Sequence, residues 1–137
     1  IEECDIQNLI DQKFNTLSGG EQRRVHFARA LIQLWQPLNT EDQKYLLLDE
    51  PFSNLDLVHK VKMMNSIKKR AGSGTGVLMI LHDLNLAYSF SDKIVILKNG
   101  KLVEKGKTKN MLSAKLLARA YETFISIDDN PINIRYY

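Results

Sequence analysis

One stretch constrains the fold more than any other: two short apolar runs separated by an amphipathic helix pattern. Residues 45–48 are apolar and are followed by Asp-Glu-Pro at 49–51, and residues 77–81 form a second apolar run that ends at His82. Short apolar runs of this kind are typical of strands that are buried on both faces of a parallel sheet. Between the runs, apolar side chains recur at helical spacing, at Leu57, Val61, Met64, Ile67 and Ala71. Strand, helix and strand in this order predict a βαβ unit with a right-handed crossover.

A second helix is predicted upstream of this unit. Ser18 is an N-cap residue, and Glu21 follows it at the spacing of a capping box. Apolar residues then recur at helical spacing, at Val25, Ala28, Leu31, Ile32 and Trp35. We expect this helix to end at Pro37 and to be followed by a polar loop over 39–44.

The remainder of the chain predicts short helices and antiparallel hairpins. The expected elements are a helix over 84–90, strands over 93–98 and 101–105, and terminal strands over 124–127 and 132–136. Asn99-Gly100 between two strands is the strongest short signal for a hairpin. Thr108 and Ser113 are expected to cap two short helices, the second of which runs to about Tyr121. The fold class is therefore expected to be α/β, with parallel βαβ strands followed by an antiparallel hairpin and C-terminal helices.

Composition restricts the classes of function. The chain has 137 residues, a formal net charge of +3 and 26% charged residues of both signs, as in a soluble globular protein. Its apolar runs are far shorter than the roughly 20 residues of a membrane span. The single cysteine, Cys4, cannot form an internal disulfide, which fits a reducing cytosol. Arg23, Arg24 and Arg29 indicate a solvated helix face rather than a concentrated basic surface, so no nucleic-acid partner is expected.

The first candidate site is the segment Leu17-Ser18-Gly19-Gly20-Glu21-Gln22. Gly19 and Gly20 allow close approach of an anion, and they stand at a helix N-terminus, where N–H groups and the helix dipole favour negative charge. Ser18 can cap the helix or donate its hydroxyl to a phosphate. The alternative is an ordinary Ser-Gly-Gly helix start. The six residues in order are far more specific than that start when they are taken together with Arg23, Arg24, Ala28, Arg29 and Ala30.

The second candidate site stands at the end of the first predicted strand, where open α/β sheets bind ligands. Asp49 there can hold a magnesium ion through water. Glu50 can accept a proton from an attacking water molecule or polarise it. Two solvated carboxylates at a strand end are the alternative interpretation of this pair.

Two further candidates lie along the chain. Asp56 closes the segment Ser53-Asn54-Leu55-Asp56 and is expected to cap the next helix, whatever else the loop does. His82 ends the second strand beside the strand of Asp49, so it could reach the same phosphate, although a lone histidine is usually structural. His26 and His59 fall on predicted helices and are interpreted as surface or partly buried side chains.

Two glycine-containing segments imitate a phosphate-binding P-loop and are rejected. Gly106-Lys107-Thr108 ends like the pattern G-x-x-x-x-G-K-[ST], but the nearest upstream glycine, Gly100, is too far away and the residues between them indicate a strand. The glycine-rich segment 72–76 joins a helix to a strand, whereas a P-loop joins a strand to a helix.

All four candidate sites resemble, in order and spacing, the motifs of ABC transporter ATP-binding subunits. Segment 17–22 is similar to the ABC signature motif, 45–49 to a Walker B strand, Glu50 to the catalytic glutamate, 53–56 to the D-loop and His82 to the switch histidine. The hairpin over 94–101 also resembles these ATPases, and the resemblance extends to about Tyr121. The segments 17–35 and 82–87 look most like the ATPases of haemin, iron-siderophore and vitamin B12 importers.

The resemblance implies a partial P-loop NTPase core. Residues 1–40 would be the remnant of a helical subdomain that carries the signature motif, and residues 41–137 part of the catalytic core. The chain would then be the C-terminal half of one ABC ATPase domain. Its start at Ile1 rather than Met also fits a fragment.

The resemblance also implies the mechanism and the partners. Two ATPase subunits would enclose two ATP molecules as a homodimer, with Ser18, Gly19, Gly20, Glu21 and Gln22 of one subunit facing nucleotide on the other. Asp49 would serve Mg²⁺, Glu50 the attacking water, His82 the γ-phosphate and Asp56 the coupling of the two sites. Transmembrane permease subunits would convert this cycle into import, with the ATPase peripheral at the cytoplasmic face of the inner membrane.

The same comparison predicts that the chain is inactive alone. No residues match a P-loop, an adenine-stacking aromatic residue or a glutamine loop, so Asp49 and Glu50 lack a bound nucleotide to act on. An exposed sheet edge and an uncovered apolar face are expected to favour association. Two alternatives stay open: an ABC-type ATPase of DNA repair, and a non-enzymatic short protein that binds a partner ATPase.

Overall fold

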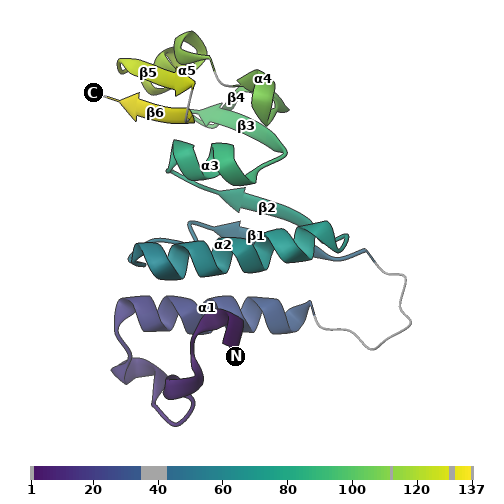
Figure 1. Ribbon diagram of the computed structural model, residues 1–137, viewed down its shortest axis with the longest axis vertical. Helices are drawn as coiled ribbons and strands as arrows, with labels where there is room; N and C mark the ends of the chain where they lie inside the picture. The colour runs from purple at the N-terminus through teal and green to yellow at the C-terminus, as the bar shows by residue number, and fades with distance from the viewer. Residues whose placement is uncertain (1, 35–42, 112, 130–131, 137) are drawn as a thin grey trace. The chain divides into compact units, whose positions relative to one another are not determined.

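The computed structural model describes residues 2–34, 43–111, 113–129 and 132–136 (Figure 1). It divides into two compact units, Ile1–Ile80 and Leu81–Tyr137. The predicted helix end at Pro37 lies outside the described residues, as do Trp35 and most of the loop 39–44.

The first unit opens with three 3-10 helices and continues into a long α-helix. The short helices are η1 (Glu2–Cys4), η2 (Gln7–Leu9) and η3 (Phe14–Thr16), and the α-helix is α1 (Gly19–Gln33). The buried side of α1 is formed by Arg24, Phe27, Ala28 and Leu31. The prediction that Arg24 lies on a solvated helix face is therefore wrong, because its guanidinium is buried against the Asp5 carbonyl and His59. Ile32, which the predicted apolar stripe included, is 69% exposed.

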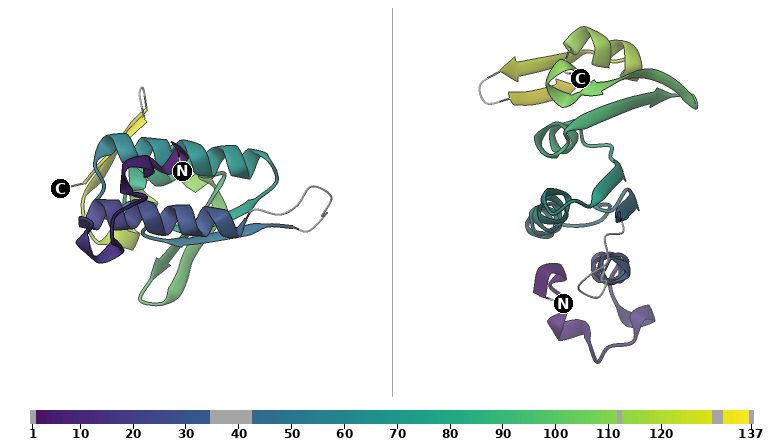
Figure 2. Two further views of the ribbon diagram at one scale, coloured as in Figure 1. Left: turned by 90° about the horizontal axis from the view of Figure 1, so that it is seen from below. Right: turned by 90° about the vertical axis from the view of Figure 1, so that its right-hand side faces the viewer.

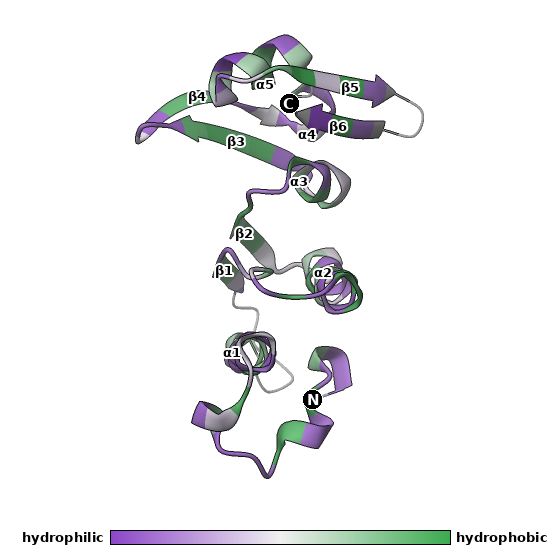
Figure 3. Ribbon diagram, turned by 90° about the vertical axis from the view of Figure 1, so that its left-hand side faces the viewer, coloured by the Kyte–Doolittle hydropathy of each residue, from purple (hydrophilic) through white to green (hydrophobic). Residues whose placement is uncertain are grey.

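The predicted βαβ unit is confirmed. It consists of β1 (Tyr45–Asp49), α2 (Leu57–Gly72) and β2 (Gly76–Ile80). The two strands pair in parallel, with Tyr45 opposite Gly76 and Asp49 opposite Ile80. Helix α2 lies on one side of the strand pair (Figures 2 and 3).

The prediction that both strands are buried on both faces is wrong. Leu46 is 4% exposed, whereas Leu47 and its register partner Leu78 are 70% and 62% exposed. Successive side chains of a strand point to opposite faces, so α2 covers only alternate residues. Within the described part of the chain, the other face of β1 and β2 is an uncovered apolar surface, as expected for a core that lacks covering elements.

The buried face of α2 also differs from the predicted one. Met64 and Ile67 are buried as expected, but Leu57 is 72% exposed and Val61 and Ala71 are exposed too. The buried stripe includes a serine, because Ser66 donates a hydrogen bond of 2.9 Å to Glu3 Oε2 of η1. Arg70 forms an ion pair of 2.7 Å with the same carboxylate. Part of this helix face therefore packs on a polar surface, which a search for apolar periodicity does not detect.

The second unit alternates short helices with two antiparallel hairpins. Its elements are α3 (Leu84–Phe90), β3 (Lys93–Lys98), β4 (Lys101–Lys107), α4 (Thr108–Met111), α5 (Ala114–Tyr121), β5 (Ile125–Asp129) and β6 (Ile132–Tyr136). The first hairpin is confirmed, with Asn99 and Gly100 at φ 50° and 71° in its turn. The terminal pairing of β5 and β6 is confirmed as well.

Capping and side-chain contacts fix the ends of these elements. The Ser113 side chain caps α5 by accepting from Leu116 N–H, as predicted. The prediction that Thr108 caps a short helix is wrong. Thr108 is the first residue of α4, and its hydroxyl donates to the Ser91 carbonyl at 2.6 Å instead of capping the helix. Gly106 and Lys107 lie in β4 and lead directly into α4, so this segment has no P-loop geometry.

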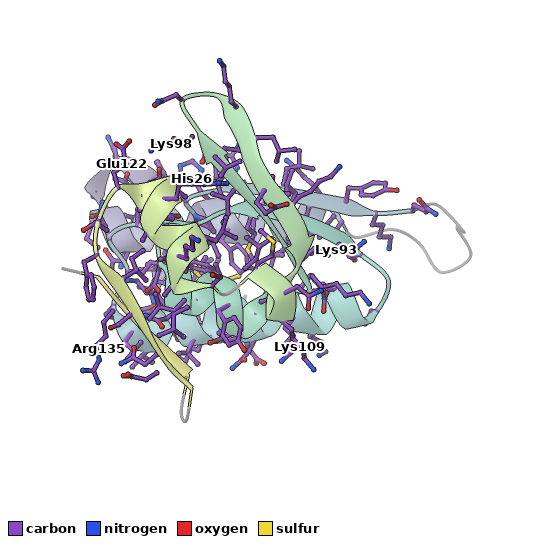
Figure 4. The ribbon with its side chains drawn as sticks, turned by 90° about the horizontal axis from the view of Figure 1, so that it is seen from above. His26, Lys93, Lys98, Lys109, Glu122 and Arg135 are labelled. Carbon is purple, nitrogen blue, oxygen red and sulfur yellow. The ribbon has the colours of Figure 1, made fainter. Side chains whose placement is uncertain are left out.

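One apolar cluster holds the second unit together. Its buried members are Ile96, Met111, Leu117, Ala120, Ile125 and Ile134. At its margin, the Lys98 ammonium pairs with Glu122 Oε1 at 2.7 Å (Figure 4). None of the helices in the described residues is both long and apolar enough to cross a bilayer.

Candidate functional site

The first turn of α1 is held by a reciprocal capping box. Ser18 Oγ accepts a hydrogen bond of 3.4 Å from Glu21 N–H, and Ser18 N–H donates at 2.8 Å to Glu21 Oε2. The Ser18 hydroxyl also donates to Glu21 Oε2, at 2.7 Å. These hydrogen bonds from Ser18 hold the pKa of the Glu21 carboxyl below its ordinary value. These hydrogen bonds hold the first turn of α1 in place, and the predicted role of Ser18 as the N-cap is confirmed.

Gly19 and Gly20 differ in their surroundings. A Cβ placed on Gly19 would have no atom within 4 Å, so this side of the helix start is open to a ligand. A Cβ placed on Gly20 would lie 3.2 Å from the carbonyl oxygen of Asn54. Gln22 ties the preceding segment to the helix, because its Nε2 donates to the Leu17 carbonyl at 2.9 Å. Gly20 thus permits a close approach between α1 and the loop that follows β1.

Asp49 and Glu50 stand at the carboxyl end of β1. Asp49 is exposed, and Glu50 N–H donates to the Ile80 carbonyl of β2 at 3.2 Å. Glu50 has φ 43°, a left-handed conformation that is uncommon for a residue other than glycine, asparagine or aspartate. The Ser53 hydroxyl lies 3.2 Å from the Glu50 carbonyl oxygen and 3.3 Å from Glu50 Oε2. The loop therefore fixes Glu50 on both its backbone and its side chain.

Asp56 caps α2, as expected, and has a partner that the sequence did not reveal. Its Oδ1 accepts from His59 N–H at 2.9 Å, and both carboxylate oxygens lie 2.8 Å from His59 Nδ1. The His59 backbone N–H first, and then the ring, lower the pKa of the Asp56 carboxyl. His59 in turn lies 2.7 Å from Arg24 Nη1 and 3.1 Å from Asp5 Oδ2 through its Nε2.

His59 and its partners are the functional candidates that sequence reasoning missed. Asp5 and His59 are 54 residues apart, so no local pattern could join them. The available signal was the position of His59 three residues after the capping Asp56, on the same helical turn.

The structure brings some predicted residues together. Gly20 of the first segment and Asn54 of the third lie against each other, and Asp49 and Glu50 lead into the same loop. His82 belongs to the second unit, two residues after Ile80, the register partner of Asp49. Its predicted position beside Asp49 stays a prediction.

The chemistry available at these elements is that of carboxylates beside a capped helix start. Among the residues that the structure describes, no three His, Cys, Asp or Glu side chains gather as a metal site. A magnesium ion does not require such a cluster, because it is commonly bound by one or two carboxylates together with water and substrate phosphates. An exposed Asp49 fits that role.

Comparison with known proteins decides the family. The family model described as "ABC transporter" matches residues 1–53. The "Hemin import ATP-binding protein HmuV" of Bartonella quintana is 40% identical over 130 residues, which cover 94% of this chain and 49% of that protein. The chain belongs to the ABC transporter ATP-binding family.

Solved structures agree with the ABC assignment. A metal-chelate type ABC transporter in an inward-facing conformation shares the fold, with a TM-score of 0.77 at 20% identity over 99% of this chain and 53% of that chain. A dimeric ATP-binding cassette bound to ADP and Pi superposes with a TM-score of 0.66 at 31% identity, over 78% of this chain and 43% of that one. The ABC-type α/β fold is thereby confirmed. The chain spans about half the length of the curated relatives that it matches.

Proposed function

We propose that the chain forms part of the ATP-hydrolysing subunit of an ABC importer and that the cargo is haemin or a related iron complex. The observation that carries the proposal is the contact between the capped start of α1 and the loop after Asp49 and Glu50. It joins the proposed signature motif (Leu17–Gln22) and the proposed D-loop (Ser53–Asp56) on one unit. The proposed cargo is inferred from the relatives that are named as haemin import proteins. They and the transporter family model also favour import over DNA repair.

The signature motif is proposed to bind the γ-phosphate of ATP held by a second subunit. Gly19 leaves open space at the start of α1, where backbone N–H groups and the helix dipole attract an anion. The capping box fixes Ser18 and Glu21, and Gln22 fixes the preceding segment to the helix. The motif is therefore preorganised, so little conformational entropy is lost when phosphate binds.

Asp49 and Glu50 are proposed to act on ATP bound to their own subunit. Asp49 would hold the Mg²⁺ that accompanies the substrate, and that ion would neutralise charge on the phosphates. Glu50 would orient the attacking water and accept its proton. Its backbone at φ 43° and its contacts with Ser53 hold the carboxylate in one place, which general-base catalysis needs.

The same proposal gives the other assignments. His82 would contact the γ-phosphate, and Asp56 would couple the two nucleotide sites across the subunit interface. Residues 1–40 are proposed as the helical subdomain and 41–137 as part of the catalytic core. The partners would be a second ATPase subunit and transmembrane permease subunits, at the cytoplasmic face of the inner membrane, and nucleic acid would not be a partner.

The decisive experiment measures ATP hydrolysis by the gene product that carries these residues, with and without Glu50→Gln. We expect magnesium-dependent turnover, and a loss of about 10² to 10⁴-fold in Glu50→Gln while ATP binding persists. Glu104→Gln on the exposed side of β4 is the matched control and should hydrolyse ATP at the unsubstituted rate. Equal turnover in the two variants would refute the role of Glu50.

The 137-residue chain provides a second test. It contains no G-x-x-x-x-G-K-[ST] pattern, so most of the phosphate contacts of a P-loop ATPase are not supplied by its own residues. We expect neither tight ATP binding nor turnover by calorimetry and phosphate release. Turnover by this chain alone would contradict the proposal.

The cargo is tested separately by reconstituting the ATPase with its permease and binding protein in vesicles. Haemin-loaded binding protein should stimulate ATP turnover more than protein loaded with a ferric siderophore or cobalamin. Stronger stimulation by either of the other cargoes would correct the cargo and leave the ATPase assignment intact.

A further inference from the structure

His59 joins two elements that the proposed function uses separately. Through Nδ1 it lies 2.8 Å from both carboxylate oxygens of Asp56, at the end of the D-loop. Through Nε2 it lies 2.7 Å from Nη1 of Arg24, in α1. The side chains of His59 and Arg24 are only 22% and 11% exposed. The contact between Arg24 and His59 is therefore largely screened from water, and a hydrogen bond to a charged group is stronger there than at an open surface. The Asp56 side chain at the other end of the bridge is 64% exposed.

The donors and acceptors define the direction of this bridge at Asp56. The Asp56 carboxylate only accepts, so Nδ1 of His59 donates to it. Nε2 lies 2.7 Å from Arg24 Nη1, which only donates, and 3.1 Å from Asp5 Oδ2, which only accepts, so its role depends on the tautomer and protonation of the ring. Arg24 also donates to the Asp5 carbonyl at 2.8 Å, and Lys62 pairs with the Asp5 carboxylate at 3.2 Å. Arg24, His59 and Asp56 thus form one continuous chain of hydrogen bonds, supported at Asp5.

A second contact joins the same two elements closer to the signature motif. A Cβ on Gly20 would lie 3.2 Å from the Asn54 carbonyl oxygen and 3.8 Å from Leu55 Cδ2. The D-loop therefore meets α1 at its first turn as well as at Arg24. Two separated contacts restrict rotation as well as translation of one element against the other.

We infer that His59 is a positioning residue that fixes the D-loop relative to the signature motif, so that the two move as one body when subunits close on ATP. This inference rests on the proposed function. In the proposed dimer the D-loop and the signature motif both act across the subunit interface, so a shift of one against the other would misplace groups at the nucleotide. A misplacement of about 1 Å can lower a catalytic rate by about 10²-fold.

Two substitutions of His59 test the two halves of the bridge separately, because each keeps one contact and removes the other. In His59→Asn the amide replaces Nδ1 and can still donate to Asp56, but it does not reach Arg24. In His59→Gln the amide replaces Nε2 and can still accept from Arg24, but it does not hold Asp56. Only the imidazole spans both partners, so we expect both variants to lower kcat for ATP about 10-fold or more. KM for ATP should change by less than about 3-fold, because the bridge is not expected to contact bound nucleotide.

The experiment is performed on the gene product that carries these residues, with His26→Gln as the control. His26 is an exposed histidine of the same helix as Arg24, and its ring stacks edge-on with Phe14 outside the bridge. The control should retain the unsubstituted kcat. Thermal unfolding of each variant shows whether the fold persists. Asp5→Asn removes the charge that lies 3.1 Å from His59 Nε2 but leaves the contact between His59 and Arg24, so it should give a smaller loss of kcat.

A double-mutant cycle tests whether Arg24 and His59 act as a unit. We expect Arg24→Gln combined with His59→Gln to lower kcat no further than the more severe single substitution. Multiplicative losses, unchanged kcat in the His59 variants, or a loss of kcat that accompanies unfolding would each overturn the inference. If the unsubstituted protein does not hydrolyse ATP, the proposed function itself fails, which is a different result.

Discussion

Glu50 and Asn54 have left-handed backbone conformations, with φ 43° and 61°. For residues with a Cβ, sparsely populated conformations of this kind cost about 1–3 kcal/mol and persist only where other contacts compensate. Here the compensation comes from Glu50 N–H bonded to Ile80 and from Ser53 bonded to Glu50. Strained residues gather at functional sites, so this loop supports the proposed roles of Glu50 and the D-loop.

The capping box at Ser18 gives a prediction for single residues. Ser18→Ala should lower the free energy of unfolding of the 137-residue chain by about 1 kcal/mol at pH 7, because Glu21 N–H loses its acceptor. The pKa of Glu21 is lowered in the folded state, so its contribution is present above the unfolded pKa and is lost as the pH falls through the folded pKa. The difference between the two proteins should therefore be largest above about pH 5 and should narrow below about pH 4.

Urea unfolding of both proteins, followed by circular dichroism at pH 7 and at pH 4, checks this prediction. Ser113→Ala is the matched control, because Ser113 caps α5 from its hydroxyl but has Leu116 where the capping box has a glutamate. The free energy of unfolding that is lost in Ser113→Ala should not depend on pH between 4 and 7. A pH-independent effect of Ser18→Ala would rule out the reciprocal box as the cause.

At the scale of elements, the uncovered face of β1 and β2 decides how the chain behaves in solution. Leu47 and Leu78 lie side by side on that face, in register. We expect Leu47→Thr with Leu78→Thr to reduce self-association of the chain, because it removes exposed apolar surface and no buried contact. Light scattering after size-exclusion chromatography measures the change.

Leu46→Ala is the control for that pair. Leu46 is buried on the opposite face, so its truncation should lower the free energy of unfolding by about 2–5 kcal/mol and should not reduce association. If the threonine pair destabilised the fold as much as Leu46→Ala, the face would be covered in solution.

The side chain of Asn85, in α3, forms hydrogen bonds with the backbone of β6 of the kind that a neighbouring strand would form. Asn85 Oδ1 accepts from Ile134 N–H at 2.8 Å, and Asn85 Nδ2 donates to the Ile134 carbonyl at 3.2 Å. Asn85→Ala should destabilise the second unit by about 1–3 kcal/mol, because it leaves both backbone groups of a buried residue without this partner. Hydrogen exchange at Ile134 N–H should accelerate in Asn85→Ala and less so in Asn85→Asp, which keeps the acceptor. Equal exchange in all three proteins would contradict the pairing.

At the scale of the whole molecule, charge and exposed apolar surface act together. The net charge is +3 at pH 7 and the sequence pI is about 9.0. Repulsion between copies therefore falls as the pH rises toward 9, while the apolar faces stay exposed. We expect more association of the chain at pH 9 than at pH 7 by light scattering at equal ionic strength. The Leu47→Thr, Leu78→Thr protein should show a smaller increase, and an association that is independent of pH would count against a role for charge.

Local chemistry in the sequence determined most of the elements. The hairpin turn at Asn99-Gly100, the caps at Ser18, Asp56 and Ser113, and the helix Leu84–Phe90 were all predicted, because each depends on residues a few positions apart. The order of motifs also indicated the ABC family, since the signature motif and the Walker B strand are contiguous segments.

Only the tertiary structure decided which faces are covered and which distant groups meet. The buried stripe of α2 and the exposed face of β1 depend on which elements lie against them, and apolar periodicity cannot identify those elements. The contacts of His59 with Arg24 and Asp5 join residues 35 and 54 positions apart. A hydrogen bond over such a separation exists only after the chain has folded, and for that reason no local pattern encodes it.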